Sequence, residues 1–254
     1  MNLIRSLTCG LLTLLLAFPA IAVAAFDRGG RRSSAIVGTW ARWLRSVAGA
    51  EVHHRGALDE LPEGPVLFLA SHESNLDIPI LFSLVPDTTR FLAKRELFRI
   101  PVFGLAIGLL GFVPVERGGR RQAATRALSQ ASEHQRRGRS LLVFPEGTRN
   151  PEPGLLPFKK GAFRLACETR QPVVPVACLG GGRLLPPGQA GMRPGRVDLV
   201  VGQPLRPEDE PEAFSDPTRL LRLARERMLE LMDTTEAATP SQDETPATET
   251  SATA

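Results

Sequence analysis

The chain has 254 residues, of which 43% are hydrophobic, so it can form one globular domain with a core and additional segments. Its formal net charge of +4 is unevenly distributed, because residues 234–254 contain acidic residues but no lysine or arginine. The basic remainder suits nucleic acid, an anionic lipid surface or a phosphorylated substrate. There is no tyrosine and only 6% of residues are aromatic. The stacking surface of a single-strand nucleic-acid binder is therefore missing, and no nucleic-acid partner is expected.

The cysteines are few and widely spaced. Cys9, Cys167 and Cys178 are odd in number and do not have the spacing of metal ligands. Such cysteines indicate a reducing compartment and buried thiols rather than disulfides or zinc. We therefore predict no metal site.

The N-terminal residues 6–26 carry no charge and are rich in leucine and alanine. A helix of this length, at about 1.5 Å per residue, spans the roughly 30 Å hydrocarbon layer of a membrane. A cleaved signal peptide is the alternative, because Arg5 precedes the run and Ala22-Val23-Ala24 resembles a cleavage site. The run is longer than a typical signal-peptide core, and many arginines follow it. We therefore expect a retained anchor in the cell (inner) membrane, with the rest of the chain on the cytoplasmic face.

A second helix is predicted over residues 36–47, where apolar residues recur at helical spacing. Trp40 and Trp43 alternate there with Arg42 and Arg45. Such a helix can lie at the lipid interface, or it can pack its tryptophan side on the domain. Residues 1–50 are thus predicted to be a membrane anchor followed by an interfacial helix.

From residue 51 onward, short apolar runs alternate with helical patterns. The predicted strands are 51–55, 66–70, 90–93, 112–116, 140–144, 173–178 and 197–201. The predicted helices are 78–85, 102–110, 120–137, 160–170 and 218–232. Several strands are continuously apolar, which is typical of a sheet covered on both faces. The fold class is therefore α/β, with a mixed, largely buried sheet covered by helices over residues 51–233. Residues 234–254 have too few apolar groups to fold and are predicted to be a disordered acidic tail.

Two glycine-containing segments have ambiguous roles. Residues 101–115 are apolar, too short to span a bilayer, and form either a buried helix or the wall of a lipid or acyl pocket. Residues 180–182 are three consecutive glycines. They lack the lysine and hydroxyl pair of a phosphate-binding loop and the spacing of a dinucleotide-binding turn. We interpret them as a turn.

The most informative residues are His72 and Asp77, which follow the apolar run 66–70. An imidazole with a pKa near ~6.5 can take a proton at neutral pH, and a nearby carboxylate fixes its tautomer and stabilises the imidazolium. Of the four histidines, only His72 combines a strand-end position with such a carboxylate. The pair is a candidate general base with its orienting acid. A hydrogen-bonded pair without a catalytic role is the alternative.

A second block, Phe144–Arg149, follows another apolar strand. Gly147 exposes backbone N–H groups, Thr148 offers a hydroxyl and Arg149 a guanidinium, which together suit a phosphate or an oxyanion. A proline-glycine turn with surface charges is the alternative. Arg117 adds a second arginine beside a glycine turn at the end of a further predicted strand.

The order of these blocks resembles the lysophosphatidate (1-acyl-sn-glycerol-3-phosphate) acyltransferase family of membrane glycerolipid acyltransferases. The resemblance covers about residues 50–205. The matching segments are His72 with Asp77, Lys94–Leu97, Pro101–Gly104, Glu116-Arg117, Phe144–Arg149 and Val173–Val176. The chain departs from the family pattern in having Arg95 inserted in the second motif, Ser71 where asparagine is usual, and Glu116 where aspartate is usual.

The resemblance implies that residues 51–233 are an acyltransferase domain. Its reaction would move a fatty acyl group from acyl-CoA or acyl carrier protein to the free hydroxyl of lysophosphatidate, without a metal or bound cofactor. Membrane lipids and the lyso-lipid acceptor are the partners implied, together with the acyl donor.

The residues are given the following roles. His72 would take the proton of the acceptor hydroxyl, and Asp77 would orient the imidazole. Arg117 and Arg149 would hold the acceptor phosphate. The expected remaining contacts are Glu146 near the glycerol unit, Thr148 on the substrate, and the Gly147 N–H as an oxyanion donor.

Three other functions remain open. The acceptor could be another lyso-lipid, such as a lyso-aminolipid or a lysophosphoglyceride with a head group. The same histidine pair could instead activate water in a membrane-bound thioesterase. In a non-catalytic lipid-binding scaffold, His72 would be dispensable.

Overall fold

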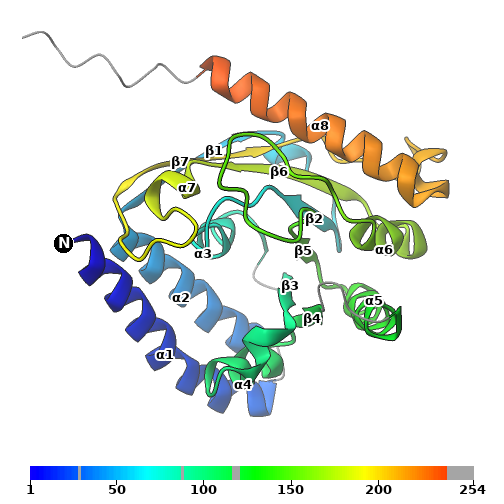
Figure 1. Ribbon diagram of the computed structural model, residues 1–254. Coiled ribbons are helices and arrows are strands. Elements are labelled where there is room, and N and C mark those ends of the chain that lie inside the picture. The colour runs from blue at the N-terminus through cyan, green and yellow to red at the C-terminus, as the bar shows by residue number, and fades with distance from the viewer. Residues whose placement is uncertain (28–29, 87–88, 116–120, 239–254) are drawn as a thin grey trace, which may run out of the picture.

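The computed structural model describes residues 1–27, 30–86, 89–115 and 121–238 (Figure 1). These residues form a seven-stranded sheet with the strand order β1-β7-β6-β2-β5-β3-β4. The strands are β1 Ala50–Gly56, β2 Leu67–Ala70, β3 Arg90–Lys94, β4 Val113–Val115, β5 Leu141–Val143, β6 Val173–Leu179 and β7 Gly195–Val201. Neighbouring strands are parallel except for β6 and β7, which are antiparallel. The mixed α/β sheet predicted from the sequence is therefore confirmed.

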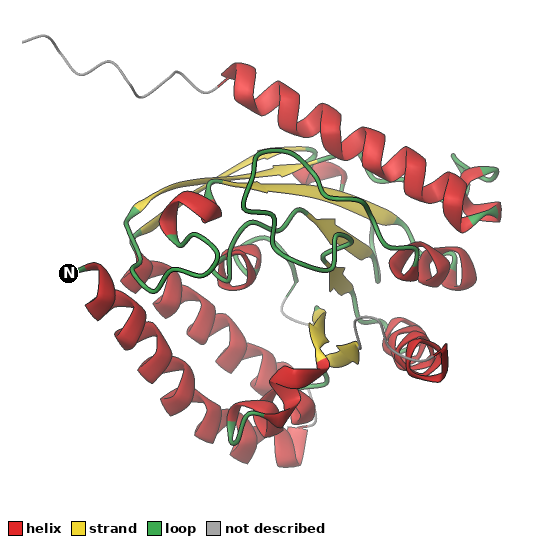
Figure 2. Ribbon diagram, in the orientation of Figure 1, coloured by secondary structure: helices red, strands yellow, loops and turns green. Residues whose placement is uncertain are grey.

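The central strand β2 is buried along its whole length, which explains why its sequence is continuously apolar. Phe68 and Ala70 belong to the core on one face, and Leu67 and Leu69 to the core on the other. Helices α1 to α4 cover the first face, and α5, α6 and α8 cover the second (Figures 1 and 2). The helices are α1 Asn2–Asp27, α2 Arg31–Ala48, α3 Asp77–Leu81, α4 Phe103–Leu109, α5 Arg121–Arg136, α6 Gly161–Thr169, α7 Gly181–Leu184 and α8 Pro217–Ala238, with 3-10 turns at Leu58–Glu60, Arg95–Arg99 and Ala213–Ser215.

Several elements differ from the prediction. Helix α2 begins at Arg31 instead of residue 36. Helix α3 ends at Leu81 instead of residue 85, and the chain tightens into i to i+3 turns before Pro86, as expected for the residues preceding a proline. The three-glycine segment does turn at Gly180, which has φ +101°, but it then enters the short helix α7. Helix α8 continues past Thr234 to Ala238, because extending an existing helix gains a hydrogen bond per residue without a new nucleation cost. Residues 239–254 of the predicted tail lie outside the described residues.

Helix α1 is, by length and composition, the one helix among the described residues that could cross a membrane. One of its faces is buried and consists of small residues, including Ala17, Ala20 and Ala24. The opposite face exposes large apolar side chains: Leu3, Ile4, Leu7, Leu11, Leu14, Leu15 and Phe18. This two-sided pattern is consistent with membrane association, since the exposed face is too apolar to favour water.

Helix α2 packs along α1 (Figure 1). The Trp40 Nε1–H donates a hydrogen bond to Thr13 Oγ1 at 3.0 Å, and its ring meets Phe82 edge-on. Trp43, by contrast, is 48% exposed. Trp40 therefore packs inward on the domain, as one of the two predicted alternatives required. Trp43 lies at the surface, where the other alternative, a position at the lipid interface, would place it.

Candidate active site

Three adjacent parallel strands deliver the site residues to one edge of the sheet. Strand β2 lies between β5 and β6 and is parallel to both. Their carboxyl ends therefore meet at the same edge, where ligand sites of α/β sheets usually lie. Each strand leads there into a connecting segment: residues 71–77 up to the start of α3, residues 144–150, and residues 180–185, which include the short helix α7. The sheet thus brings together the two predicted blocks and the three-glycine segment.

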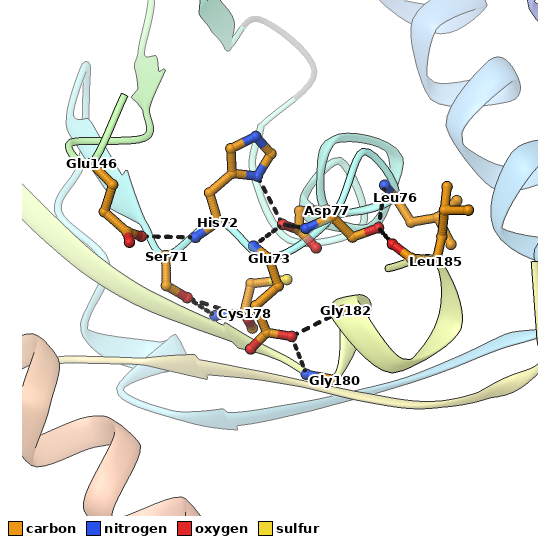
Figure 3. Close-up of polar contacts among 11 residues, drawn as sticks. Ser71, His72, Glu73, Leu76, Asp77, Glu146, Cys178, Gly180, Gly182 and Leu185 are labelled. Atoms are coloured by element: carbon orange, nitrogen blue, oxygen red, sulfur yellow. Dashed lines mark hydrogen bonds and ion pairs between the residues drawn. The ribbon is translucent and has the colours of Figure 1, made fainter. Parts of the chain in front are cut away.

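His72 and Asp77 are in direct contact (Figure 3). The distance from His72 Nδ1 to Asp77 Oδ2 is 2.8 Å, and both residues are buried. A carboxylate can only accept hydrogen bonds, so Nδ1 carries the proton of the neutral imidazole. The other ring nitrogen, Nε2, is then the one that can take a proton from a substrate.

The Asp77 carboxylate is held by backbone as well as by the imidazole. Its Oδ2 also accepts the N–H groups of Glu73 and Ser74, each at 2.8 Å. An aspartate three or four residues further along can reach back to close a loop in this way. The orientation of the carboxylate is therefore fixed by the main chain next to His72, and the orientation of the imidazole follows from it.

The loop of residues 144–150 wraps around His72. The Phe144 ring stacks on the imidazole, with ring centroids 3.8 Å apart and planes inclined by 13°. The Glu146 Oε1 accepts the His72 N–H at 3.1 Å, and the Asn150 N–H donates to the His72 carbonyl oxygen at 2.7 Å. This loop therefore positions the histidine, a role that the sequence pattern did not indicate.

Glu146 uses both carboxylate oxygens within the protein. Its Oε2 accepts the Leu156 N–H at 2.9 Å, in addition to the His72 bond of Oε1. The side chain is buried, and burial raises the pKa of Glu146 while the two N–H bonds oppose the rise. The sequence placed this residue near the glycerol unit of an acceptor. The structure shows the carboxylate bracing the loop against His72, and its place near the glycerol unit stays a prediction.

Gly147 has φ +71°, a conformation that favours glycine. Its N–H donates to the Phe144 carbonyl oxygen at 3.0 Å, and the Lys159 side chain occupies the space that a Cβ at this position would need. The N–H therefore closes the turn in this structure, and its role as an oxyanion donor stays a prediction. The turn at Gly147 sets the direction of the following residues, Thr148 and Arg149.

The remaining predicted contacts lie beside this turn or outside the described residues. Thr148 is exposed and Arg149 is half-buried. Their substrate-binding roles stay predictions. Arg117 lies in 116–120, outside the described residues.

Sequence reasoning missed several residues that hold the histidine loop to β6 and α7 (Figure 3). The Ser71 hydroxyl accepts the Cys178 N–H at 2.8 Å and donates to the Cys178 carbonyl oxygen at 3.2 Å. The Ser74 hydroxyl donates to the Leu185 carbonyl oxygen at 2.8 Å. Ser71 and Cys178 are 107 residues apart, so no local pattern could have revealed the pair.

An apolar cavity of about 460 Å³ opens beside the histidine loop. Asn75 and Leu76 of that loop form part of its lining, together with residues of α1, α2 and α4. The α4 residues Phe103, Ala106 and Ile107 lie in the segment for which two roles were possible. That segment is therefore the wall of an apolar cavity.

The histidine pair, the wrapped loop and the neighbouring cavity can be compared with known proteins. A family model described as Acyltransferase matches residues 49–179, which is more than half of the chain. The chain belongs to the acyltransferase family. The family resemblance inferred from the order of the sequence motifs is thereby confirmed.

Individual proteins that are similar to this chain agree with the assignment. A 1-acyl-sn-glycerol-3-phosphate acyltransferase of Pseudomonas aeruginosa is 33% identical over 186 residues, covering 71% of each chain. The chloroplastic 1-acyl-sn-glycerol-3-phosphate acyltransferase BAT2 of Brassica napus is 38% identical over 151 residues, 58% of this chain. The chain spans less than half of the length of that plant relative, 43%. The crystal structure of the 1-acyl-sn-glycerophosphate (LPA) acyltransferase PlsC from Thermotoga maritima superposes with a TM-score of 0.73 at 28% identity, covering 93% of this chain and 98% of that one.

Replacing Glu146 should test its bracing role. Glu146→Ala removes the acceptor of two backbone N–H groups, those of His72 and Leu156. Each buried N–H left without a partner costs about 1–3 kcal/mol, so the free energy of unfolding should fall by that order. Denaturant unfolding in detergent measures it. Glu146→Gln keeps one acceptor oxygen and should lose less, whereas equal stability of Glu146→Ala and the unaltered protein would contradict the bracing role.

Proposed function

We propose that this protein transfers a fatty acyl group from acyl-CoA or acyl carrier protein to the free hydroxyl of lysophosphatidate, giving phosphatidate for phospholipid synthesis. The observation that carries the proposal is the buried His72–Asp77 contact at 2.8 Å, wrapped by the Phe144–Arg149 loop and next to an apolar cavity. The activity named for the relatives from Pseudomonas aeruginosa and Haemophilus influenzae supports it.

The transfer needs a general base and then a general acid, and the His72 imidazole can serve as both. His72 Nε2 takes the proton of the acceptor hydroxyl as the oxygen attacks the thioester carbonyl. A carbon–oxygen bond forms, and the carbon–sulfur bond breaks as the tetrahedral intermediate collapses. The imidazolium then returns the proton to the leaving thiolate, and Asp77 stabilises the imidazolium in between. This sequence uses no metal or bound cofactor.

The acceptor phosphate is assigned to Arg149 and, from the sequence motif alone, to Arg117. Arg149 follows the Gly147 turn directly and is half-buried. A guanidinium binds a phosphate with two parallel hydrogen bonds, so Arg149 and Arg117 suit a phosphate monoester. Thr148, with its exposed hydroxyl, is placed as a further polar contact.

The apolar cavity is assigned to an acyl chain. Its lining combines aromatic and aliphatic side chains, and it reaches the loop that carries His72 through Asn75 and Leu76. Burial of an acyl chain contributes about 0.8 kcal/mol per methylene group. The cavity would therefore supply binding energy to an acyl chain held beside the histidine loop.

The membrane is assigned to the exposed face of α1. The buried face of this helix packs on α2 and lines the cavity, so only the opposite face is available to lipid. With the exposed face of α1 in lipid, the cavity that the opposite face lines would lie near the membrane from which an acyl-bearing substrate would enter. The catalytic domain would then face the cytoplasm at the cell (inner) membrane, as the arginines that follow α1 favour.

Removing the imidazole tests the base. His72→Ala should lower kcat by at least ~100-fold, the lower range for loss of a general base. Asp77→Asn should also lower kcat, since the imidazolium loses its charged partner. The matched control is His53→Ala, because His53 is exposed on β1. Steady-state transfer from labelled acyl-CoA to lysophosphatidate measures both. Near-normal kcat in His72→Ala would exclude the proposed mechanism.

Removing Arg149 tests the acceptor site. Hydrogen bonds to a charged group contribute ~1.5–3 kcal/mol, so Arg149→Ala should raise the KM for lysophosphatidate roughly 10- to 150-fold. Arg149→Lys should recover only part of the loss, because an ammonium group lacks the planar fork. Arg164→Ala, at an exposed position on α6, is the control. An increase confined to the KM for acyl-CoA would assign Arg149 to the donor instead.

Charges on the exposed face of α1 test the membrane assignment. Leu7 is 65% exposed and Leu11 56% exposed, so Leu7→Glu with Leu11→Glu leaves the buried face intact. We expect this double variant to lose binding to phospholipid vesicles while its melting temperature stays unchanged, because charged side chains are costly in the hydrocarbon layer. Vesicle flotation measures the binding. Undiminished flotation would show that another surface attaches the protein.

A further inference from the structure

Glu73 is a half-buried carboxylate for which the proposed mechanism has no use. It follows His72 directly, yet its side chain points away from the imidazole toward the glycine turn between β6 and α7 (Figure 3). Its Oε2 accepts the N–H of Gly180 and the N–H of Gly182, each at 3.0 Å. Burial raises the pKa of Glu73, and these two N–H bonds oppose the rise.

The turn is built of glycine because it approaches the histidine loop closely. Gly180 has φ +101°, which favours glycine. A Cβ on Gly181 would collide with Asp77 Oδ1, and a Cβ on Gly182 would lie 3.3 Å from Glu73 Oε2. The three consecutive glycines therefore leave room for the two carboxylates of one loop and present backbone N–H groups to one of them.

The main chain of Glu73 also contributes one of the hydrogen bonds that the Asp77 carboxylate accepts. The Glu73 N–H donates to Asp77 Oδ2, the same oxygen that accepts the proton on His72 Nδ1. The side chain and the main chain of one residue thus link the glycine turn to the Asp77 carboxylate. Ser74, the next residue, is tied to the same region through its bond to the Leu185 carbonyl oxygen.

We infer that Glu73 is a positioning residue for the acyl transfer: its carboxylate clamps the main chain of residues 72–74 to the Gly180–Gly182 turn. This clamp keeps the N–H groups of Glu73 and Ser74 aimed at Asp77, and through Asp77 it fixes the imidazole of His72. The inference deepens the proposed function and rests on it for the identity of the reaction. Glu73 has no contact with the reacting atoms in this arrangement.

The chemistry of the side chain predicts a graded series of variants. Glu73→Ala leaves the Gly180 and Gly182 N–H groups without their acceptor. Glu73→Gln keeps an amide oxygen that can accept both, with a weaker bond because the charge is gone. Misplacement of a catalytic group by about 1 Å costs up to ~100-fold in rate, so Glu73→Ala should lower kcat roughly 10- to 100-fold. Glu73→Gln should stay within about fivefold of the unaltered protein.

The kinetic test uses Asp216 as a matched control. Asp216 Oδ1 also accepts two backbone N–H groups of one turn, those of Thr218 and Arg219, at the start of α8 and away from the site. Glu73→Ala and Asp216→Ala should both lower the melting temperature, but only Glu73→Ala should lower kcat. The KM values for lysophosphatidate and acyl-CoA should change by less than about threefold in both variants, because neither side chain binds substrate in this arrangement.

A spectroscopic test reads the imidazole directly. In full-length protein labelled with ¹⁵N-histidine, His72→Ala assigns the Nδ1–H resonance that reports the bond to Asp77. Glu73→Ala should shift or broaden this resonance, and Asp216→Ala should leave it unchanged. This measurement needs no substrate. Failure of the unaltered protein to acylate lysophosphatidate would therefore reject the proposed function while the resonance still tests the clamp.

Three results would overturn the inference. The first is a kcat for Glu73→Ala equal to that of the unaltered protein. The second is an equal loss of kcat in Asp216→Ala, which would make the effect one of general stability. The third is an unchanged His72 Nδ1–H resonance in Glu73→Ala.

Discussion

The Asp77 carboxylate is fully buried, and removing a carboxylate from water is costly unless hydrogen-bond donors or a cation compensate the loss. In this protein one oxygen, Oδ2, receives the His72 imidazole N–H and two backbone N–H groups at 2.8 Å each. Those donors exist only when residues 72–77 adopt one loop conformation. The orientation of the imidazole, and with it the direction of Nε2, therefore depends on the conformation of this loop.

The loop cannot hold that conformation alone, and the sheet supplies the support. Strands β5 and β6 flank β2 in parallel, so their following loops lie on either side of residues 71–77. From one side, Phe144 stacks on the imidazole and Glu146 accepts the His72 N–H. From the other, the Gly180–Leu185 segment receives the Glu73 and Ser74 side chains. The same edge of the sheet also opens toward the cavity beneath α1 to α4, which joins the site to the apolar face of the molecule.

Much of this could be predicted from the sequence because its cause is local. The central strands β2, β5 and β6 are continuous apolar runs, and the His72–Asp77 contact spans only one loop. The contacts of Glu146 could not be predicted. One partner, His72, follows the neighbouring strand β2, and the other, Leu156, lies ten residues further along the chain. The internal use of the Gly147 N–H depends on a turn geometry that the letters Pro-Glu-Gly do not specify. The pairing of Glu73 with Gly180 and Gly182 joins residues more than a hundred positions apart, and only the strand order of the sheet brings them together.

The most direct measurement is an acceptor panel with the purified protein in detergent and labelled acyl-CoA. The acceptors are lysophosphatidate, a lyso-aminolipid, a lysophosphoglyceride with a head group, and water alone. A phosphate monoester beside Arg149, with the hydroxyl at His72 Nε2, predicts that the label appears in phosphatidate and depends on lysophosphatidate. Release of free fatty acid without any acceptor, at a rate equal to that of transfer to lysophosphatidate, would show that the His72–Asp77 pair activates water. Faster labelling of another lyso-lipid than of lysophosphatidate would show that the acceptor is a different one.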